Sequence, residues 1–307
     1  MSFVIAHFSD LHVLAIDGVP LRRFLNKRIT GYANLRFKRK HIHRVAYLKA
    51  IARELSAMHV DHVAITGDMT NLALQSEFQL AKTLLEDELH LAPEHVSIVP
   101  GNHDMYTAGA ARSKRFTDYF APFTSSDLPD LSGNCAAGAF PFVRLRGPVA
   151  IIGLSSAVPR LPLISAGTIG SSQLAALTRI LEQPQVEARL PVILCHHPIH
   201  NPAGLLDRAM RGLRDAAQLG KALDGLDRGL FLHGHLHERM HRVHRTAQGE
   251  LASVGATSAS LHHDEAARMA GFNLYEVSDD GQVVSIEARV FDPKTERFES
   301  RPVPLKR

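Results

Sequence analysis

The chain has 307 residues, of which 45% are hydrophobic and 21% charged, a balance typical of a globular protein and not of a disordered chain. Its length allows one large core or two smaller ones, and no run approaches the roughly 18 apolar residues of a membrane-spanning helix. The N-terminal residues lack the features of a signal peptide, and nothing indicates that Cys135 and Cys195 pair. We therefore expect a cytoplasmic protein.

Positive charge is distributed unevenly, although the net charge is only +4. Residues 21–53 contain eleven lysines and arginines and no acidic residue. Such a block often contacts phosphate-bearing surfaces, so an anionic membrane surface is a candidate partner for residues 21–53 and nucleic acid is a less favoured one. Peripheral association with a membrane is therefore the alternative to a purely cytoplasmic localisation. A solvated basic loop and helix explains the same block equally well.

Short apolar runs alternate with helical segments in the first three quarters of the chain. The runs predict strands at Phe3–Phe8, His62–Thr66, Val96–Val99, Phe140–Leu145, Val149–Leu154, Val192–Cys195 and Leu230–His233. Apolar residues at helical spacing predict helices at Arg44–Met58, Ser76–Leu89 and Ser171–Leu181.

The last quarter, residues 240–307, is predicted to be mainly β. Its strands are expected at Met240–Arg245, Glu250–Val254, Phe272–Val277 and Val283–Phe291, with the Asp280-Gly281 turn joining the last two. Together the elements predict a mixed α/β protein that forms a single domain over residues 1–307.

Five of the predicted strands are followed at once by a polar cluster. The clusters are Ser9-Asp10-Leu11-His12, Gly67-Asp68, Pro100-Gly101-Asn102-His103-Asp104, His196-His197-Pro198 and His233-Gly234-His235-Leu236-His237. Ligands collect at the carboxyl ends of strands in open α/β sheets. The clusters are therefore expected to converge, although they lie far apart in the sequence.

The residue types in these clusters fit divalent metals of intermediate hardness. Carboxylate, imidazole and amide ligands suit Mn, Fe, Co or Zn, whereas a structural zinc site would favour thiolates. The spacing of Asp10 with His12 and of His235 with His237 places each pair on one face of an extended segment. Gly67, Gly101 and Gly234 are expected where the backbone turns sharply beside the ligands.

In combination, these motifs resemble those of the calcineurin-like metallophosphoesterases. The resemblance implies a four-layer α/β/β/α sandwich of two mixed sheets around two metal ions. It further implies the ligands of each ion, with Asp68 shared between them. One ion would be held by Asp10, His12, Asp68 and His237, and the other by Asp68, Asn102, His196 and His235. Of the adjacent histidines His196 and His197, the family pattern favours His196 as the ligand.

The same resemblance implies a phosphoester hydrolase that works by in-line attack of a metal-bridging hydroxide. We expect His103 to donate a proton to the leaving alkoxide and Asp104 to orient His103. The motifs Gly-Asn-His-Asp and His-His-Pro are most similar to those of the bacterial class III cyclic-nucleotide phosphodiesterases. Cyclic nucleotides or other small phosphodiesters are therefore the expected substrates.

Two segments leave other functions open. Residues 13–41 are a basic insertion relative to the compact form of that group, and would form a cap, a membrane contact or an oligomer interface. Asn201–Leu219 would be a pocket lid or an ordinary connection. The alternatives are a membrane-associated hydrolase of a lipid-linked pyrophosphate or phospholipid, a nuclease, or a non-catalytic scaffold.

Overall fold

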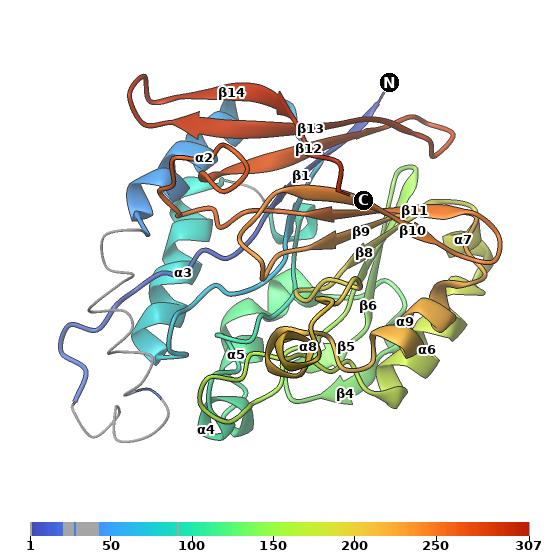
Figure 1. Cartoon of the computed structure of the whole chain (residues 1–307), viewed down its shortest axis with the longest axis horizontal. Helices are drawn as coiled ribbons and strands as arrows, with labels where there is room; N and C mark the ends of the chain where they lie inside the picture. Colours follow the sequence, from blue (N-terminus) through green and yellow to red (C-terminus); the bar gives the residue numbers. More distant parts are fainter. Residues whose placement is uncertain (1, 21–27, 29–42, 91, 307) are drawn as a thin grey trace.

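Two six-stranded sheets form the centre of the molecule (Figure 1). The structure is a computed structural model, and it describes residues 2–20, 28, 43–90 and 92–306. The first sheet has the order β14 (Arg297–Pro302), β13 (Val283–Asp292), β12 (Gly271–Val277), β1 (Phe3–Phe8), β2 (His62–Ile65) and β3 (Val96–Ile98). The second has the order β10 (Met240–Arg245), β11 (Glu250–Gly255), β9 (Arg228–His233), β8 (Leu190–Leu194), β7 (Val149–Gly153) and β6 (Phe142–Arg146).

Both sheets are mixed. In the first, β1, β2 and β3 run parallel, whereas β12, β13 and β14 pair antiparallel. In the second, β7, β8, β9 and β11 run parallel, with β6 and β10 antiparallel at the edges. Strands from the two ends of the chain lie side by side, because blue β1 pairs with orange β12 (Figure 1).

Alternation along the strands of the second sheet separates two cores. In β7, Val149 and Ile151 pack into the core that the second sheet shares with the first sheet and with α2 (Val45–Ala57) and α3 (Gln75–Glu88). Their neighbours Ala150 and Ile152 point to the opposite face, in the core that includes α6 (Ser171–Leu181) and α9 (Ala216–Leu223). Since successive strand residues face opposite sides, this pattern confirms the predicted four-layer α/β/β/α sandwich of two mixed sheets.

Most predicted elements are found within a residue or two of their expected bounds. The predicted strand Phe140–Leu145 is divided into β5 (Gly138–Phe140) and β6, because Pro141 between them has no N–H for a ladder bond. The sequence pattern missed several short elements. These are β4 (Gly133–Cys135), β14, α4 (Ala108–Arg112), α5 (Arg115–Phe120), α7 (Pro184–Glu187), α8 (Leu205–Arg211), α9, and the 3-10 turns Pro93–His95, Ala121–Thr124 and Pro129–Leu131.

Most of the basic segment 21–53, and much of the insertion 13–41, lies outside the described residues. One basic member that is described, Arg28, is buried and donates to the carbonyl oxygens of Leu72 (2.7 Å) and Ala73 (3.0 Å). This guanidinium therefore stabilises the loop before α3 and is not available to contact a membrane or another partner. None of the helices in the described ranges is long and apolar enough to cross a bilayer.

Glu77 at the start of α3 makes stability depend on pH. Its carboxylate accepts the backbone N–H groups of Leu72 (2.9 Å) and Leu74 (3.1 Å), but burial dominates and raises its pKa to about 8. The folded protein therefore retains a proton that the unfolded chain loses, and stability falls as pH rises from about 5 to 8.

Glu77→Gln removes this titration while it keeps the amide-binding oxygen. Between pH 5 and 8 we expect the metal-free wild type to lose about 1–3 kcal/mol more unfolding free energy than the variant. Urea unfolding at both pH values measures this difference, and parallel pH curves for the two proteins would contradict it.

Candidate metal centre

The five polar clusters converge, as predicted from their positions at strand ends. β1, β2 and β3 of the first sheet and β8 and β9 of the second all belong to the parallel parts of their sheets. Their carboxyl ends meet, and atoms able to bind a metal gather there within 4.8 Å of one another in three groups. The groups are Asp10, His12 and His237; His12, Asp68 and His103; and Asp10, Asp68 and His196.

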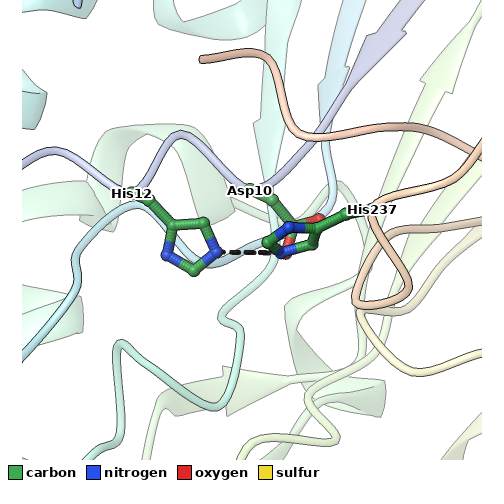
Figure 2. Close-up of side chains that lie close together, drawn as sticks. All are labelled: Asp10, His12 and His237. Atoms are coloured by element: carbon green, nitrogen blue, oxygen red, sulfur yellow. Dashed lines mark hydrogen bonds and ion pairs between the residues drawn. The ribbon is translucent and has the colours of Figure 1, made fainter. Parts of the chain in front are cut away.

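The first group consists of Asp10, His12 and His237 (Figure 2). Nε2 of His12 and Nε2 of His237 lie 3.0 Å apart, and Asp10 Oδ1 lies 3.1 Å from the latter and 3.7 Å from the former. Ligand atoms at roughly 2.1 Å from one ion lie roughly 3.0–3.4 Å from each other, so the spacing fits a shared cation. Asp10 Oδ1 is buried and accepts no hydrogen bond from the described residues, which also fits a cation ligand.

Asp68 lies between this group and a second set of ligand atoms. Its Oδ2 is 3.8 Å from His12 Nε2 on one side and 3.4 Å from His196 Nε2 on the other. Asn102 Oδ1 also lies 3.2 Å from His196 Nε2. The other ring nitrogen of His196, Nδ1, contacts the Thr66 carbonyl oxygen at 2.7 Å. One carboxylate thus connects two sets of nitrogen and oxygen ligands.

His235 lies beside the second set but in none of the three groups. Its ring centroid is 5.1 Å from that of His196, and its backbone N–H donates to Asp10 Oδ2 at 3.0 Å. Nε2 of His235 contacts the Arg211 carbonyl oxygen at 3.0 Å. Of the two ring nitrogens, Nδ1 is therefore the one left to bind a metal.

His103 is fixed at both its backbone and its ring. Its backbone N–H donates to Asp68 Oδ1 at 2.7 Å, and its Nδ1 lies 2.6 Å from the Asn71 carbonyl oxygen. Because a carbonyl only accepts, Nδ1 carries the hydrogen. The ring meets that of His12 edge-on, with centroids 4.8 Å apart.

The Asp104 carboxylate has partners other than the one expected. It accepts the backbone N–H groups of Gly101 (2.9 Å), Met69 (3.2 Å) and Thr70 (3.0 Å), together with the Thr70 hydroxyl. The Nδ1 partner of His103 is Asn71, so Asp104 holds the loops that carry Asp68 and His103 rather than this nitrogen. Burial and the charge of Asp68 raise the pKa of Asp104 to about 7.

Two buried carboxylates attract positive charge to the centre. Burial alone would raise the pKa of Asp10 and of Asp68, yet the neighbouring histidines lower both below the ordinary range. Burial disfavours the charged form of His196, but the Asp68 carboxylate outweighs this and raises its pKa to about 9. Without a cation, a proton on His196 therefore compensates the carboxylates, and a metal ion would replace it.

That competition predicts how metal affinity varies with pH. Below pH 9 the metal must displace the His196 proton, so the apparent affinity should rise about tenfold per pH unit from pH 7 to 9 and then level off. Competition titration with a chelator at several pH values measures this slope. A flat affinity over the same range would contradict the assignment of His196 as a ligand.

The ligand loops adopt an uncommon backbone conformation. Asp10, His12, Asp68, His235 and His237 all have positive φ, between 47° and 69°. The segments that carry the Asp10/His12 and His235/His237 pairs are therefore not extended, contrary to the prediction from their spacing. Non-glycine residues in this region are uncommon and gather at functional sites. Five of the seven predicted metal ligands share this feature, which aims side chains from tight loops toward one point.

Two of the three glycines beside the ligands provide space rather than a sharp turn. Gly67 has the expected left-handed φ of 94°. At Gly101, however, an added Cβ would lie 2.1 Å from Asp68 Oδ1, and at Gly234 it would lie 2.4 Å from Asp10 Oδ2. The expectation of a turn was therefore incomplete, because the backbone at these two positions packs directly against the carboxylates.

His43 belongs to the same imidazole cluster and was missed by the sequence reasoning. Its ring centroid is 4.9 Å from that of His12 and 5.9 Å from that of His237, and its Nδ1 lies 2.7 Å from Ser260 Oγ. His43 follows no predicted strand. Only the tertiary structure brings it to the ends of these strands.

The fold and the His/Asp site together are those of a metal-dependent phosphoesterase with a dimetal centre. The family model described as calcineurin-like phosphoesterase matches residues 3–239, well over half of the chain. The chain therefore belongs to the calcineurin-like phosphoesterase family. A search of curated proteins finds no match.

Solved structures share this fold at low sequence identity. A dimetal phosphatase from Danio rerio has 14% identity and a TM-score of 0.59, over 98% of this chain and 99% of that one. A 5'-nucleotidase precursor from Thermus thermophilus has 16% identity and a TM-score of 0.54, over 97% of this chain and 56% of that one. A purple acid phosphatase from yellow lupin has 11% identity and a TM-score of 0.55, over 100% and 54% respectively.

Proposed function

We propose that the chain is a phosphodiesterase, with cyclic nucleotides or other small phosphodiesters as substrates. The position of Asp68 between two sets of ligand atoms supports two ions more directly than any other observation. Asp10, His12, Asp68 and His237 would hold one ion, and Asp68, Asn102, His196 and His235 the other. Mn, Fe, Zn and Co all suit these ligands.

The charge of the ligand set suits an anionic substrate. Two bound metal ions would acidify a water molecule and stabilise charge on the phosphoryl oxygens. Asp10 and Asp68 are the two carboxylates among the proposed ligands, and Asn102 is neutral. The site would therefore stay electropositive with its metals bound, which favours binding of a phosphoester anion.

His103 is the proposed proton donor to the leaving alkoxide. One of its ring nitrogens lies within 4.8 Å of ligand atoms of His12 and Asp68, which places the ring at the edge of the centre. The Asn71 carbonyl fixes the hydrogen on Nδ1 and thereby the orientation of the ring. Asp104 is proposed as a positioning residue, since its hydrogen bonds connect the loops of Asp68 and His103.

A substrate panel on protein loaded with one defined metal tests the proposed function. It would contain bis-p-nitrophenyl phosphate, a cyclic nucleotide, a glycerophosphodiester, a phosphomonoester and a lipid-linked pyrophosphate. We expect kcat/KM for at least one small diester to exceed that for the monoester by about tenfold or more. A clear preference for the monoester, or inactivity on every compound, would overturn the proposal.

A further inference from the structure

The loops beside His197 and His235 carry an unusual group of exposed leucines. Of the seven strongly exposed large hydrophobic side chains in the described part of the chain, four are here: Leu161 (73% exposed), Leu163 (81%), Leu205 (80%) and Leu206 (77%). Scattered single leucines on a surface need no explanation, but a local group marks a contact site. We call these four side chains the apolar lip.

The two segments that carry the apolar lip lie side by side. The backbone N–H of Ser165 donates to the Met210 carbonyl at 2.8 Å, and that of Gly167 donates to the Gly212 carbonyl at 3.0 Å. The Asp215 carboxylate accepts the backbone N–H of Gly170 at 2.7 Å and so joins the segments again. Leu161 and Leu163 precede these bonds in one segment, and Leu205 and Leu206 open α8 (labelled in Figure 1) in the other.

The apolar lip is also anchored to the metal centre. The Arg211 carbonyl contacts His235 Nε2 at 3.0 Å, and the Ser165 carbonyl contacts His197 Nε2 at 2.7 Å. The rings of His197 and His235 are 4.3 Å apart. The two segments that carry the lip therefore contact the proposed ligand His235 and its neighbour His197 directly.

The two segments that carry these leucines also carry an excess of positive charge. Residues 158–170 and 201–215 contain four arginines and two aspartates. Asp207 pairs with Arg211 at 2.7 Å, and Asp215 accepts backbone N–H groups. Arg208 and Arg214 are exposed, and in the described ranges no acidic oxygen lies within 4.0 Å of either. Exposed leucines suit the acyl-chain region of a lipid surface, and exposed arginines suit its anionic headgroups.

We propose that the apolar lip docks on an anionic lipid surface, which would give the metal centre access to phosphodiesters at that surface in addition to the small phosphodiesters proposed above. The substrate class rests on the phosphodiesterase function proposed above, whereas the docking does not. The leucines would enter the boundary of headgroups and acyl chains, and Arg208 and Arg214 would face the lipid phosphates. A soluble partner protein or a second copy of the chain would use the leucines without needing anionic lipid.

Co-sedimentation with vesicles tests the docking. The wild type is expected to bind vesicles of equal parts phosphatidylglycerol and phosphatidylcholine at least about tenfold more tightly than vesicles of pure phosphatidylcholine. Leu163→Ser with Leu205→Ser should weaken binding to the anionic vesicles by about tenfold or more. The matched control is Val243→Ser with Val284→Ser, which changes two exposed apolar residues elsewhere and should leave binding unchanged.

Several results would overturn the docking. The docking is wrong if the wild type does not bind anionic vesicles, or if the control variant is weakened as much as the leucine variant. It is also wrong if the leucine variant binds as tightly as the wild type, a result that would assign the membrane contact to residues 21–53. A dimer that the leucine substitutions convert to monomer would assign the lip to self-association and also overturn it. Thermal melting confirms that each variant folds. Turnover of bis-p-nitrophenyl phosphate by the wild type reports separately on the proposed function.

Discussion

Replacing Asp68 with alanine is expected to leave the chain unable to hold two metal ions and to reduce phosphodiester turnover by about 10³-fold or more. Asp68 is the carboxylate that lies between His12 and His196, so its loss removes an oxygen from both sets of ligands. Elemental analysis of reconstituted protein, together with bis-p-nitrophenyl phosphate turnover, measures both effects.

Asp127→Ala is the matched control for Asp68→Ala. Asp127 pairs with Arg146 at 2.9 Å, and Arg146 contacts the Glu94 carbonyl just before β3 begins, at the opposite end of the strand from the metal centre. The control should retain both ions and wild-type turnover. An Asp68→Ala protein that still binds two equivalents of metal would refute the bridging position of Asp68.

His103→Ala is expected to separate substrates by their leaving group. Without a proton donor, turnover of an ester with an alkoxide leaving group should fall by about 10²–10⁴-fold. An ester that releases p-nitrophenolate needs little protonation and should lose far less. Measuring kcat on both substrates, in protein that contains its metals, gives this ratio.

Metal content decides between two roles for His103. As a proton donor it can be removed without loss of either ion, whereas a ligand role, which its position near His12 and Asp68 also allows, predicts loss of metal. The control is His95→Ala. The Nδ1 of His95 likewise lies near a backbone carbonyl, that of Asp61, but His95 precedes β3 and so lies at the end of the strand away from the metal centre. Equal losses on the two substrates would exclude the acid role.

Strand positions and the polar residues that follow them predicted a mixed α/β protein and the convergence of the five polar clusters, whereas the four-layer sandwich was predicted from the family resemblance. Parallel strands bring their carboxyl ends together, so residues as distant in sequence as Asp10 and His237 meet once the strands are placed. The alternation of Ala150 and Ile151 between two cores follows from the same strand periodicity. Local pattern and sheet geometry agree in this part of the chain.

Contacts that depend on backbone groups and packing could not be predicted in this way. The Asn71 carbonyl that orients His103 is a main-chain atom and leaves no trace in residue type. His43 reaches the imidazole cluster only through the tertiary fold. The need for a glycine at position 101 depends on where the Asp68 carboxylate lies. The apolar lip could not be predicted because the sequence does not tell which leucines stay exposed. Such features require the positions of atoms from other elements.

The most direct test of the account is an anomalous diffraction map of crystals grown with Mn²⁺. We predict two peaks about 3.5–4 Å apart, one beside Asp10 Oδ1, His12 and His237 and one beside His196 and Asn102, with Asp68 between them. A single peak, or peaks away from these side chains, would contradict the dimetal centre on which the proposed activity depends.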